Sequence, residues 1–452
     1  MKEKIDLVVL GTGTGGAAPA RECRAAGWRV AVVDDQPYGG TCGNRGCDPK
    51  KVLVGAADVV SWHLRMKGYG VAGNASIDWP SLIAFKRTFT DPLPASREAA
   101  FKKAGIETLH GEARFVAEDR IAIGDRELTA KHVVIATGAS PRPLGIPGEE
   151  HVVSSTAFME LDALPRRIIF IGAGYISLEF AHLARNAGAE VVVLGRGTPL
   201  PAFEGALVDR LIEHTRKIGI DVRLDHSVCA VERASPMAPL RVQVGHGANM
   251  EFVETDLVVH GAGRVPNSAH IGAAAGHVEL EHHGAIRVNE FLQSVSNPRV
   301  YAAGDVVRPP GALPLTPVAG HEGSVVAKNL LGGNSERPDL RAIASVVFTL
   351  PALASVGLTE QAARAKGIQV RVASADTTEW FTNRRIREPV GMFKTIVDEK
   401  TDRVVGAHLL GAQAEEVINL FAMAIRFDIP VSELKQMIYA YPTGSSNMAY
   451  ML

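Results

Sequence analysis

A glycine-rich turn between an apolar strand and a helix occurs twice in this 452-residue chain, and this repeat restricts the possible folds most. In the first copy an apolar run leads into Gly11, Gly13 and Gly16, and an alanine-rich segment follows. Glycines at this spacing let a pyrophosphate approach the first turn of a helix, where free N–H groups and the helix dipole attract an anion. The segment therefore predicts a dinucleotide-binding β-α-β unit.

The second copy follows the apolar run 167–171, with Gly172, Gly174 and Ser177 at the same spacing. A single motif of this kind is weak evidence, because glycine-rich turns occur in other α/β sheets. Two copies in one chain predict two nucleotide sites.

The two copies differ at the end of their second strand. The first has Asp34 there, and a carboxylate at this position accepts a hydrogen bond from a ribose hydroxyl. The second has Gly195 followed by Arg196, which removes the repulsion of a 2′-phosphate and offers a guanidinium. We expect FAD at the first site and NADPH at the second; the alternative is that Arg196 is only a solvated surface charge.

Two of the chain's four cysteines, Cys42 and Cys47, follow the first unit and are framed by paired glycines, a threonine and a Pro-Lys-Lys exit. This arrangement predicts a redox-active dithiol beside a nucleotide. A helix start near Cys47 and the cation of Lys50 should lower a thiol pKa and favour the reactive thiolate. Arg45 would act in the same direction and Asp48 against it, unless the two form a solvated pair at the helix start.

Composition gives no reason to expect a macromolecular or membrane partner. The net charge is −1, so the chain as a whole has no positive charge to attract nucleic acid or an anionic membrane. Four cysteines are too few for a disulfide-stapled secreted protein of this size, and no apolar leader or span of transmembrane length is present. We expect a cytoplasmic protein that acts on small molecules, with no metal site.

The rest of the chain predicts an α/β fold with two Rossmann-like nucleotide-binding domains and a C-terminal α+β dimerisation domain. Apolar strands ending in small residues suggest further cofactor turns at Thr137 and Gly138, at Gly263, and at Gly304 and Asp305. Strand-like and helix-like runs alternate from about residue 341. The expected boundaries are 1–145 (FAD-binding, first part), 146–266 (NAD(P)H-binding), 267–337 (FAD/central, second part) and 338–452 (interface).

With these motifs in place, the chain resembles the class I pyridine nucleotide-disulfide oxidoreductases, in the branch that contains glutathione reductase, dihydrolipoamide dehydrogenase and mercuric reductase. The resemblance covers essentially the whole chain, including the segments 39–51, 261–267, 301–305 and 315–319. It implies FAD, a pyridine nucleotide and a homodimer whose active sites are shared between the subunits.

The resemblance also implies residue roles. Cys42 resembles the thiol that attacks substrate and Cys47 the thiol against the flavin. Lys50 and Glu179 resemble the pair beside the flavin where hydride arrives, and Tyr175 the tyrosine that gates the nicotinamide pocket. The residues that would bind FAD are Gly11, Gly13, Thr14, Gly15, Gly16, Asp34, Gly40, Thr41, Lys50, Ala113, Thr137, Gly138, Gly304 and Asp305. Those that would bind NADPH are Gly172, Gly174, Tyr175, Ile176, Glu179, Arg196 and Gly263.

The chain departs from the family near its C-terminus. Tyr441 stands where disulfide reductases have a histidine that protonates the leaving thiolate, and Ser446 replaces its glutamate partner. A neutral tyrosine donates a hydrogen bond but is a poor proton shuttle near neutral pH, and Tyr439 is an alternative for the role. Ser324 replaces an arginine that glutathione enzymes use to bind substrate; Arg384, Arg385 and Arg387 either supply a new anion pocket or form a solvated loop.

The sequence is compatible with three functions. The first is an NADPH-dependent disulfide reductase with an acceptor that tolerates loss of the His-Glu pair. The second is a metal-ion or quinone reductase on the same scaffold, although the C-terminal cysteine pair of mercuric reductases is missing here. The third is a catalytically silent flavoprotein, against which the intact Cys42, Cys47, Lys50 and Glu179 argue.

Overall fold

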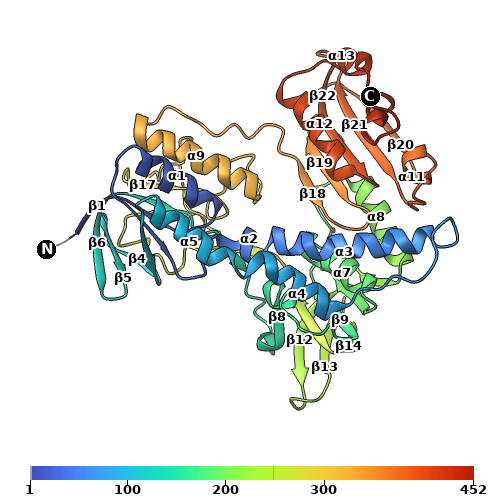
Figure 1. Cartoon of the computed structure of the whole chain (residues 1–452), viewed down its shortest axis with the longest axis horizontal. Helices are drawn as coiled ribbons and strands as arrows, with labels where there is room; N and C mark the ends of the chain where they lie inside the picture. The colour runs from blue at the N-terminus through green and yellow to red at the C-terminus, as the bar shows by residue number, and fades with distance from the viewer. Residues whose placement is uncertain (1–2, 248) are drawn as a thin grey trace. The chain divides into compact units, whose positions relative to one another are not determined.

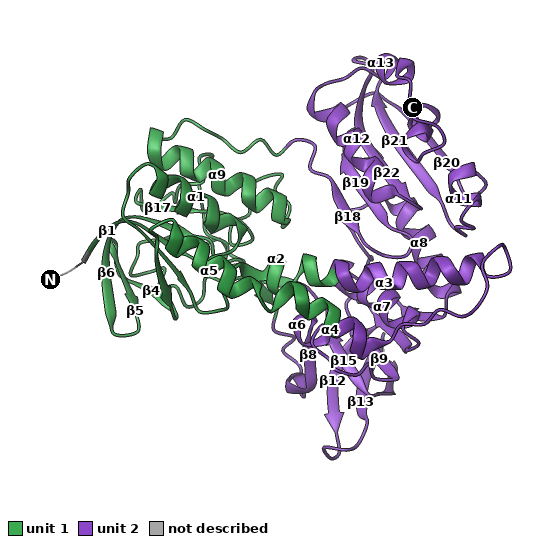
Figure 2. Ribbon diagram, viewed as in Figure 1, with its two compact units in different colours: residues 1–50, 84–142, 264–340 green, residues 51–83, 143–263, 341–452 purple. Residues whose placement is uncertain are grey.

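The structure is a computed structural model that describes residues 3–247 and 249–452. It divides into two compact units, shown in separate colours in Figure 2. The first contains residues 1–50, 84–142 and 264–340, and the second contains residues 51–83, 143–263 and 341–452. Each unit holds a largely parallel sheet flanked by helices, as predicted, whereas the four-part domain division stays a prediction.

The first unit is built on a seven-stranded sheet of order β3-β2-β1-β6-β5-β4, with β17 beside β6. Strands β1, β2, β3, β6 and β17 pair in parallel, and β4 and β5 add an antiparallel extension. The strands are β1 Glu3–Leu10, β2 Val30–Asp34, β3 Glu107–His110, β4 Ala113–Ala117, β5 Arg120–Ile123, β6 Arg126–Ile135 and β17 Val300–Ala302. A two-stranded ribbon of β7 Ala139–Pro141 and β16 Arg264–Pro266 lies beyond β6.

Helices cover this sheet because its central strands are apolar on both faces. Leu7, Val8 and Val9 are fully buried in β1, as expected for a central parallel strand. Figure 1 shows α1 and α9 side by side over the sheet. The helices of this unit are α1 Thr14–Ala25, α2 Gly40–Arg45, α5 Leu93–Lys103 and α9 Thr316–Gly332. Two further helices, α3 Cys47–Met66 and α4 Trp79–Thr90, contribute residues to both units.

The second unit repeats the parallel arrangement in a five-stranded sheet of order β11-β10-β9-β15-β8. Its strands are β8 Val152–Ser154, β9 Arg167–Ile171, β10 Glu190–Leu194, β11 Ile220–Arg223 and β15 Leu257–His260. An antiparallel meander that the sequence patterns did not predict, β12 Ser227–Arg233, β13 Leu240–His246 and β14 Asn249–Thr255, follows β11. The helices here are α6 Ser155–Phe158, α7 Tyr175–Asn186 and α8 Gly205–Lys217, with the short η1 Glu149–His151.

The C-terminal part of this unit is the expected α+β domain. Its antiparallel sheet has the order β18-β19-β22-β21-β20. The strands are β18 Ser345–Val347, β19 Leu353–Gly357, β20 Val370–Asp376, β21 Met392–Asp398 and β22 Arg403–Leu410. The helices are α10 Glu360–Ala365, α11 Phe381–Arg384, α12 Ala414–Arg426 and α13 Val431–Gln436, with η2 Ser445–Tyr450.

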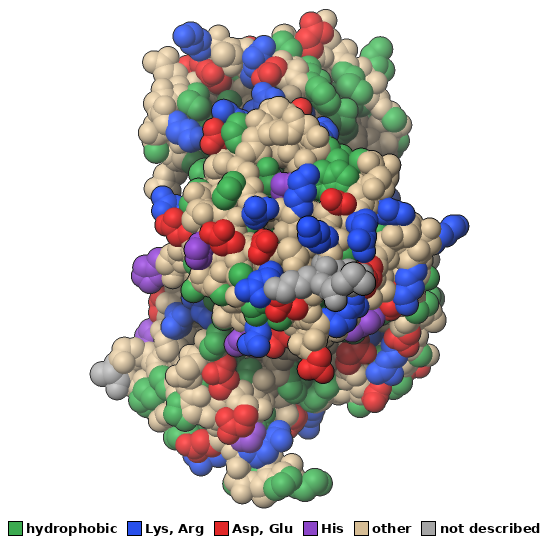
Figure 3. Space-filling view, turned by 90° about the vertical axis from the view of Figure 1, so that its left-hand side faces the viewer, with side chains coloured by type: hydrophobic (Ala, Val, Ile, Leu, Met, Phe, Trp, Pro, Cys, Tyr) green, Lys and Arg blue, Asp and Glu red, His purple; other side chains and the backbone are tan. Residues whose placement is uncertain are grey.

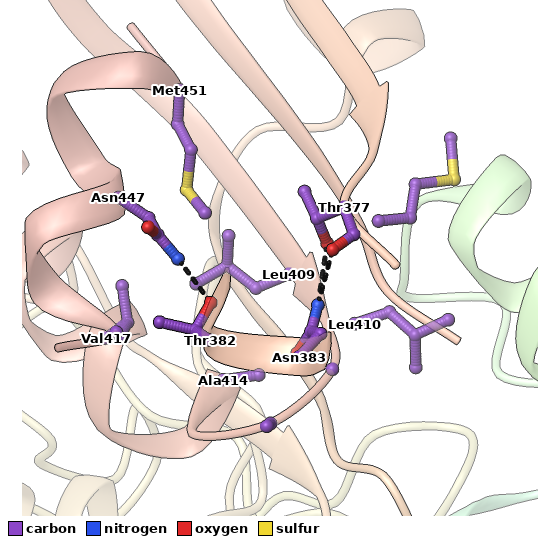
Figure 4. A pocket seen from close by; sticks show the side chains of 13 residues that line it. Thr377, Thr382, Asn383, Leu409, Leu410, Ala414, Val417, Asn447 and Met451 are labelled. Atoms are coloured by element: carbon purple, nitrogen blue, oxygen red, sulfur yellow. Dashed lines mark hydrogen bonds between the residues drawn. The ribbon is translucent and has the colours of Figure 1, made fainter. Parts of the chain in front are cut away.

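A small cavity lies between α11, α12 and the end of β22 in this domain (Figure 4). Its volume is about 30 Å³, and hydrogen bonds at its wall join Asn447 to Thr382 (2.8 Å) and Asn383 to Thr377 (3.2 Å). A space of this size holds no more than a few water molecules. The cavity is therefore a packing space within the domain and not a binding site for a substrate.

The surface carries both signs of charge. Figure 3 shows Lys and Arg side chains intermixed with Asp and Glu over the face that it displays. Among residues 3–247 and 249–452, no helix combines the length and the apolar character needed to cross a bilayer.

An aromatic cluster stabilises the second unit and can be tested directly. The ring of Phe158 packs against Phe170 and Phe180 at centroid distances of 5.6 and 4.9 Å, and all three side chains are at most 2% exposed. We expect Phe158→Ala to lower the free energy of unfolding by about 3–5 kcal/mol, because it leaves a cavity. Phe85→Ala, at a residue that is 56% exposed, should change it by less than about 0.5 kcal/mol. Urea unfolding of the two variants, followed by circular dichroism, checks both.

Candidate active site

The ends of two strands and the start of α2 converge on the turn before α1. Gly11 has φ +101°, and a Cβ there would lie 2.3 Å from the carbonyl oxygen of Ala136 at the end of β6. A Cβ on Gly40, the first residue of α2, would lie 2.5 Å from the Cα of Gly13. Only glycine permits this close packing, which leaves the first turn of α1 as a cradle for a phosphate.

The other residues predicted to bind FAD border the same turn. Thr14 begins α1, and the backbone at Gly15 approaches Ala303 at the end of β17. Thr137 and Gly138 follow β6 and are fixed by hydrogen bonds to Asn267, 2.6 Å from the Thr137 hydroxyl and 2.9 Å from the Gly138 carbonyl. The structure also places Gly16 in α1, Thr41 in α2 and half-buried Ala113 at the start of β4.

Asp34 ends β2 and is already held in place. Its Oδ2 accepts hydrogen bonds from the backbone N–H of Thr12 (2.8 Å) and from the Thr12 hydroxyl (2.6 Å). Its Oδ1 accepts one from the N–H of Gln36 (3.0 Å). Oδ2 has both its acceptor sites filled, whereas Oδ1 keeps one, so Asp34 fits its predicted role toward a ribose through Oδ1.

Asp305 has a buried neighbour that sequence patterns did not reveal. The carboxylate of Glu322, 1% exposed on α9, accepts a hydrogen bond from the N–H of Gly304 at 2.7 Å. Burial raises the pKa of Glu322 to about 7, although the Gly304 contact opposes this shift. Burial also raises the pKa of Asp305. A glutamate on an expected helix is usually solvated, so only the fold could show this position.

The two cysteines lie on either side of the junction between α2 and α3. Cys42 is half-buried in α2, and Cys47 is the first residue of α3. Both are free thiols in this structure. The Sγ of Cys47 lies 3.6 Å from the hydroxyl of Thr316, the first residue of α9, and the Sγ of Cys42 lies 3.9 Å from Asp48. No sequence pattern predicted a role for Thr316.

The surroundings distinguish the two thiols. The hydrogen bond from Cys42 lowers the pKa of Cys47 to about 6; Thr316 and Lys50 act in the same direction, while burial and Asp48 oppose them. The same contact with Cys47, followed by burial, raises the pKa of Cys42. These surroundings favour negative charge on Cys47 over Cys42, and Lys50 acts in that direction as expected.

In the second unit the predicted nicotinamide residues occupy the first turns of α7. Gly172 and Gly174 precede the helix, Tyr175 begins it and Ile176 follows, half-buried. Tyr175 is 44% exposed, whereas Glu179, one turn later, is 1% exposed. The Oε1 of Glu179 accepts a hydrogen bond from the N–H of Phe348 at 2.7 Å. This bond ties α7 to the segment after β18.

A second contact, which no sequence pattern predicted, also joins α7 to the segment after β18. His182, fully buried on α7, accepts a hydrogen bond from the N–H of Leu350 at 3.2 Å through Nδ1. Burial lowers the pKa of His182 to about 3, so this imidazole stays neutral.

The position predicted to select the nicotinamide cofactor is open to solvent. Arg196 is exposed just after β10 and makes no hydrogen bond or ion pair with any described residue. A Cβ on Gly195 would lie 2.8 Å from the Cβ of Ala173, so an acid fits there only if the turn moves. Gly263 is exposed just before β16, which belongs to the first unit.

The C-terminal tyrosines differ in availability. Tyr439 donates its hydroxyl to the carbonyl of Leu434 at 3.0 Å, and burial raises its pKa. Tyr441 is 78% exposed. Ser446, at the glutamate position, donates its hydroxyl to the carbonyl of Thr443 at 2.7 Å and so closes a local turn. Of the two tyrosines, Tyr441 has the hydroxyl that can meet another molecule.

A glycine turn before α1, a second before α7 and a neighbouring pair of thiols are features of one class of protein, the nucleotide-dependent dithiol oxidoreductases. Residues 5–323 match the model of the family described as pyridine nucleotide-disulphide oxidoreductase, and residues 343–452 match its dimerisation domain. The chain therefore belongs to this family, whose flavoproteins use FAD and a pyridine nucleotide.

Individual relatives agree with this assignment. Glutathione reductase of Burkholderia cepacia is 35% identical over 98% of this chain and 97% of its own. Mercuric reductase of Bacillus cereus is 30% identical over 98% of this chain and 70% of its own. The solved Cu(II) complex of the HOCl-induced flavoprotein disulfide reductase RclA from Escherichia coli matches with a TM-score of 0.88 and 28% identity, covering 99% of each chain.

The acidity of Cys47 gives a prediction. In the reduced holoenzyme, we expect the long-wavelength thiolate–flavin absorbance to be constant above neutral pH and to fall by half near pH 6, as Cys47 takes up a proton. Thr316→Val should move this midpoint upward, because it removes a hydrogen-bond donor to the thiolate. Thr88→Val, at an exposed hydroxyl on α4, is the control. A midpoint near the reference thiol value of about 8.5 would contradict the assignment.

Proposed function

We propose that this protein is an NADPH-dependent FAD flavoprotein that reduces a disulfide through Cys42 and Cys47. The observation that carries the proposal is the different surroundings of the two thiols: Cys47 begins α3 with its Sγ 3.6 Å from the hydroxyl of Thr316, whereas the Sγ of Cys42 lies 3.9 Å from Asp48. The cation of Lys50, one turn farther along α3, lowers the pKa of Cys47 and supports the same proposal.

The chain's own residues account for the thiol chemistry. When bound, FAD and NADPH supply two electrons to the thiol pair. Cys42 passes its proton to the Cys47 thiolate and attacks one sulfur of the acceptor disulfide, and the first leaving thiolate takes that proton from Cys47 and departs as a thiol. The Cys47 thiolate attacks Cys42, releases the second thiol and leaves a Cys42–Cys47 disulfide. Two electrons and two protons thus convert one disulfide to two thiols.

The dimerisation domain supports a homodimer, and the exposure of Tyr441 fits a hydroxyl that acts across the interface. In this proposal Tyr441 donates a hydrogen bond to the leaving sulfur, as a weaker substitute for a histidine. The few cysteines support a cytoplasmic location.

A metal-ion reductase is the second candidate, and two comparisons favour it. The relatives include mercuric reductases, and the matching structure of RclA is a Cu(II) complex. Quinone reduction is a further form of this alternative. In each case no leaving thiolate needs a proton from a histidine, so tyrosine at position 441 would not slow the reaction.

Arg196 sets the expected preference for NADPH. Arg196→Ala should raise the KM for NADPH about tenfold, since it removes a charge-assisted contact with the 2′-phosphate, and should leave the KM for NADH within about twofold. Arg233→Ala, another exposed arginine in the same unit, is the matched control. Equal changes for the two cofactors would contradict the preference.

Steady-state turnover with several acceptors separates the two candidates. We expect NADPH oxidation with glutathione disulfide or another low-molecular-weight disulfide, and its loss by at least about a hundredfold in Cys42→Ser, because serine is no thiolate nucleophile. Turnover of Cu(II), Hg(II) or a quinone with no activity on any disulfide would instead establish the second candidate.

A further inference from the structure

Two side chains of α7 accept hydrogen bonds from the backbone that follows β18. The Oε1 of Glu179 accepts one from the N–H of Phe348 at 2.7 Å, and the Nδ1 of His182 accepts one from the N–H of Leu350 at 3.2 Å. Glu179 and His182 lie one turn apart on one face of the helix. The segment 348–350 is therefore attached to α7 at both of its ends.

The ring of His182 is fixed by a contact on its other side. Its Nε2 lies 2.9 Å from the hydroxyl of Thr215 on α8, and this hydroxyl donates to the carbonyl of Leu211 at 2.8 Å. Because the hydroxyl has only one proton, it accepts from Nε2–H, which leaves Nδ1 free of a proton and able to accept. Burial, which lowers the pKa of His182, keeps the ring in this neutral form.

A second histidine holds the same peptide from α8. The Nε2–H of His214 donates to the carbonyl of Leu350 at 3.1 Å. Leu350 thus has its N–H bound to α7 and its carbonyl bound to α8, and it is itself 7% exposed. A buried hydrogen bond is costly to leave unmade, so the peptide of Leu350 cannot move along the helices without a penalty.

The position of this peptide determines how the carboxylate of Glu179 is held. Phe348 is two residues before Leu350, so a displacement of the Leu350 peptide also moves the N–H that Oε1 accepts. That hydrogen bond sets the rotation of the carboxylate. In the proposed function Glu179 acts beside the flavin, and a misplacement of about 1 Å near a reacting group can slow a reaction by about a hundredfold.

We propose that His182 is a positioning residue for the reduction of the flavin by NADPH. Through the peptide of Leu350, and with the help of His214, it keeps the N–H of Phe348 on Glu179 while a hydride passes from NADPH to FAD. That step oxidises NADPH and reduces FAD by two electrons, and His182 neither gains nor loses a proton. The inference rests on the role of Glu179 in the proposed function.

Two substitutions at position 182 separate the two hydrogen bonds of the ring. The amide of asparagine can occupy the place of Nδ1, and the amide of glutamine the place of Nε2. His182→Asn therefore keeps an acceptor for the N–H of Leu350, whereas His182→Gln keeps only the contact with Thr215. The measurement is the anaerobic reduction of the flavin by NADPH in a stopped-flow instrument, with each variant as the holoenzyme.

We expect the limiting rate of flavin reduction to fall at least about tenfold in His182→Gln and to stay within about threefold of wild type in His182→Asn. The Kd for NADPH should change far less than the rate, because the glycine turn before α7 is intact in both variants. The matched control is His408→Gln, at a histidine of β22 that is 1% exposed and makes one hydrogen bond through each ring nitrogen. It should lower stability and leave the limiting rate unchanged.

A wild-type limiting rate in His182→Gln would overturn the proposal. Equal losses in the asparagine and glutamine variants would also overturn it, because they would show that the ring acts only through packing. If circular dichroism shows that His182→Gln does not fold, His214→Asn, which removes the contact with the carbonyl of Leu350, replaces it with the same two outcomes for the rate. If NADPH does not reduce the flavin of the wild-type protein at all, the proposed function itself fails.

Discussion

The close approach of backbone to backbone at the turn before α1 is the constraint on which the site depends. Gly11 packs on the carbonyl of Ala136, and Gly40 packs on Gly13, at distances that no side chain permits. These contacts join the ends of β1 and β6 to the start of α2. They therefore position the first turn of α1 next to α2, in which Cys42 lies two residues after Gly40.

Electrostatics then gives each cysteine its role. The hydrogen bond between the two thiols lowers the pKa of Cys47 and raises the pKa of Cys42. The start of α3, Thr316 at the start of α9 and the cation of Lys50 all favour charge on Cys47. The proposed activity requires this asymmetry, because the thiol that attacks an acceptor and the thiol that exchanges electrons with a flavin must be different.

Sequence patterns predicted the parts of the molecule that local chemistry determines. The two glycine turns, the dithiol and Asp34 have fixed spacings, and the buried strand β1 is apolar throughout, so each could be recognised. The meander β12–β14 was not predicted, although Leu240, Val242 and Val244 alternate along β13 and are buried; the third strand, β14, is mostly exposed and gives a weaker pattern. Glu322, Thr316 and His182 were missed because their partners are distant in sequence, so that only tertiary packing reveals them.

The central claim is that Cys42 and Cys47 exchange electrons with the pyridine nucleotide. The most direct test treats the oxidised holoenzyme with iodoacetamide, anaerobically, with and without NADPH, and locates the label by peptide mass spectrometry. The account predicts alkylation at Cys42 or Cys47 only after NADPH is added, with Cys229 labelled equally in both samples. Equal labelling of the pair with and without NADPH would contradict it.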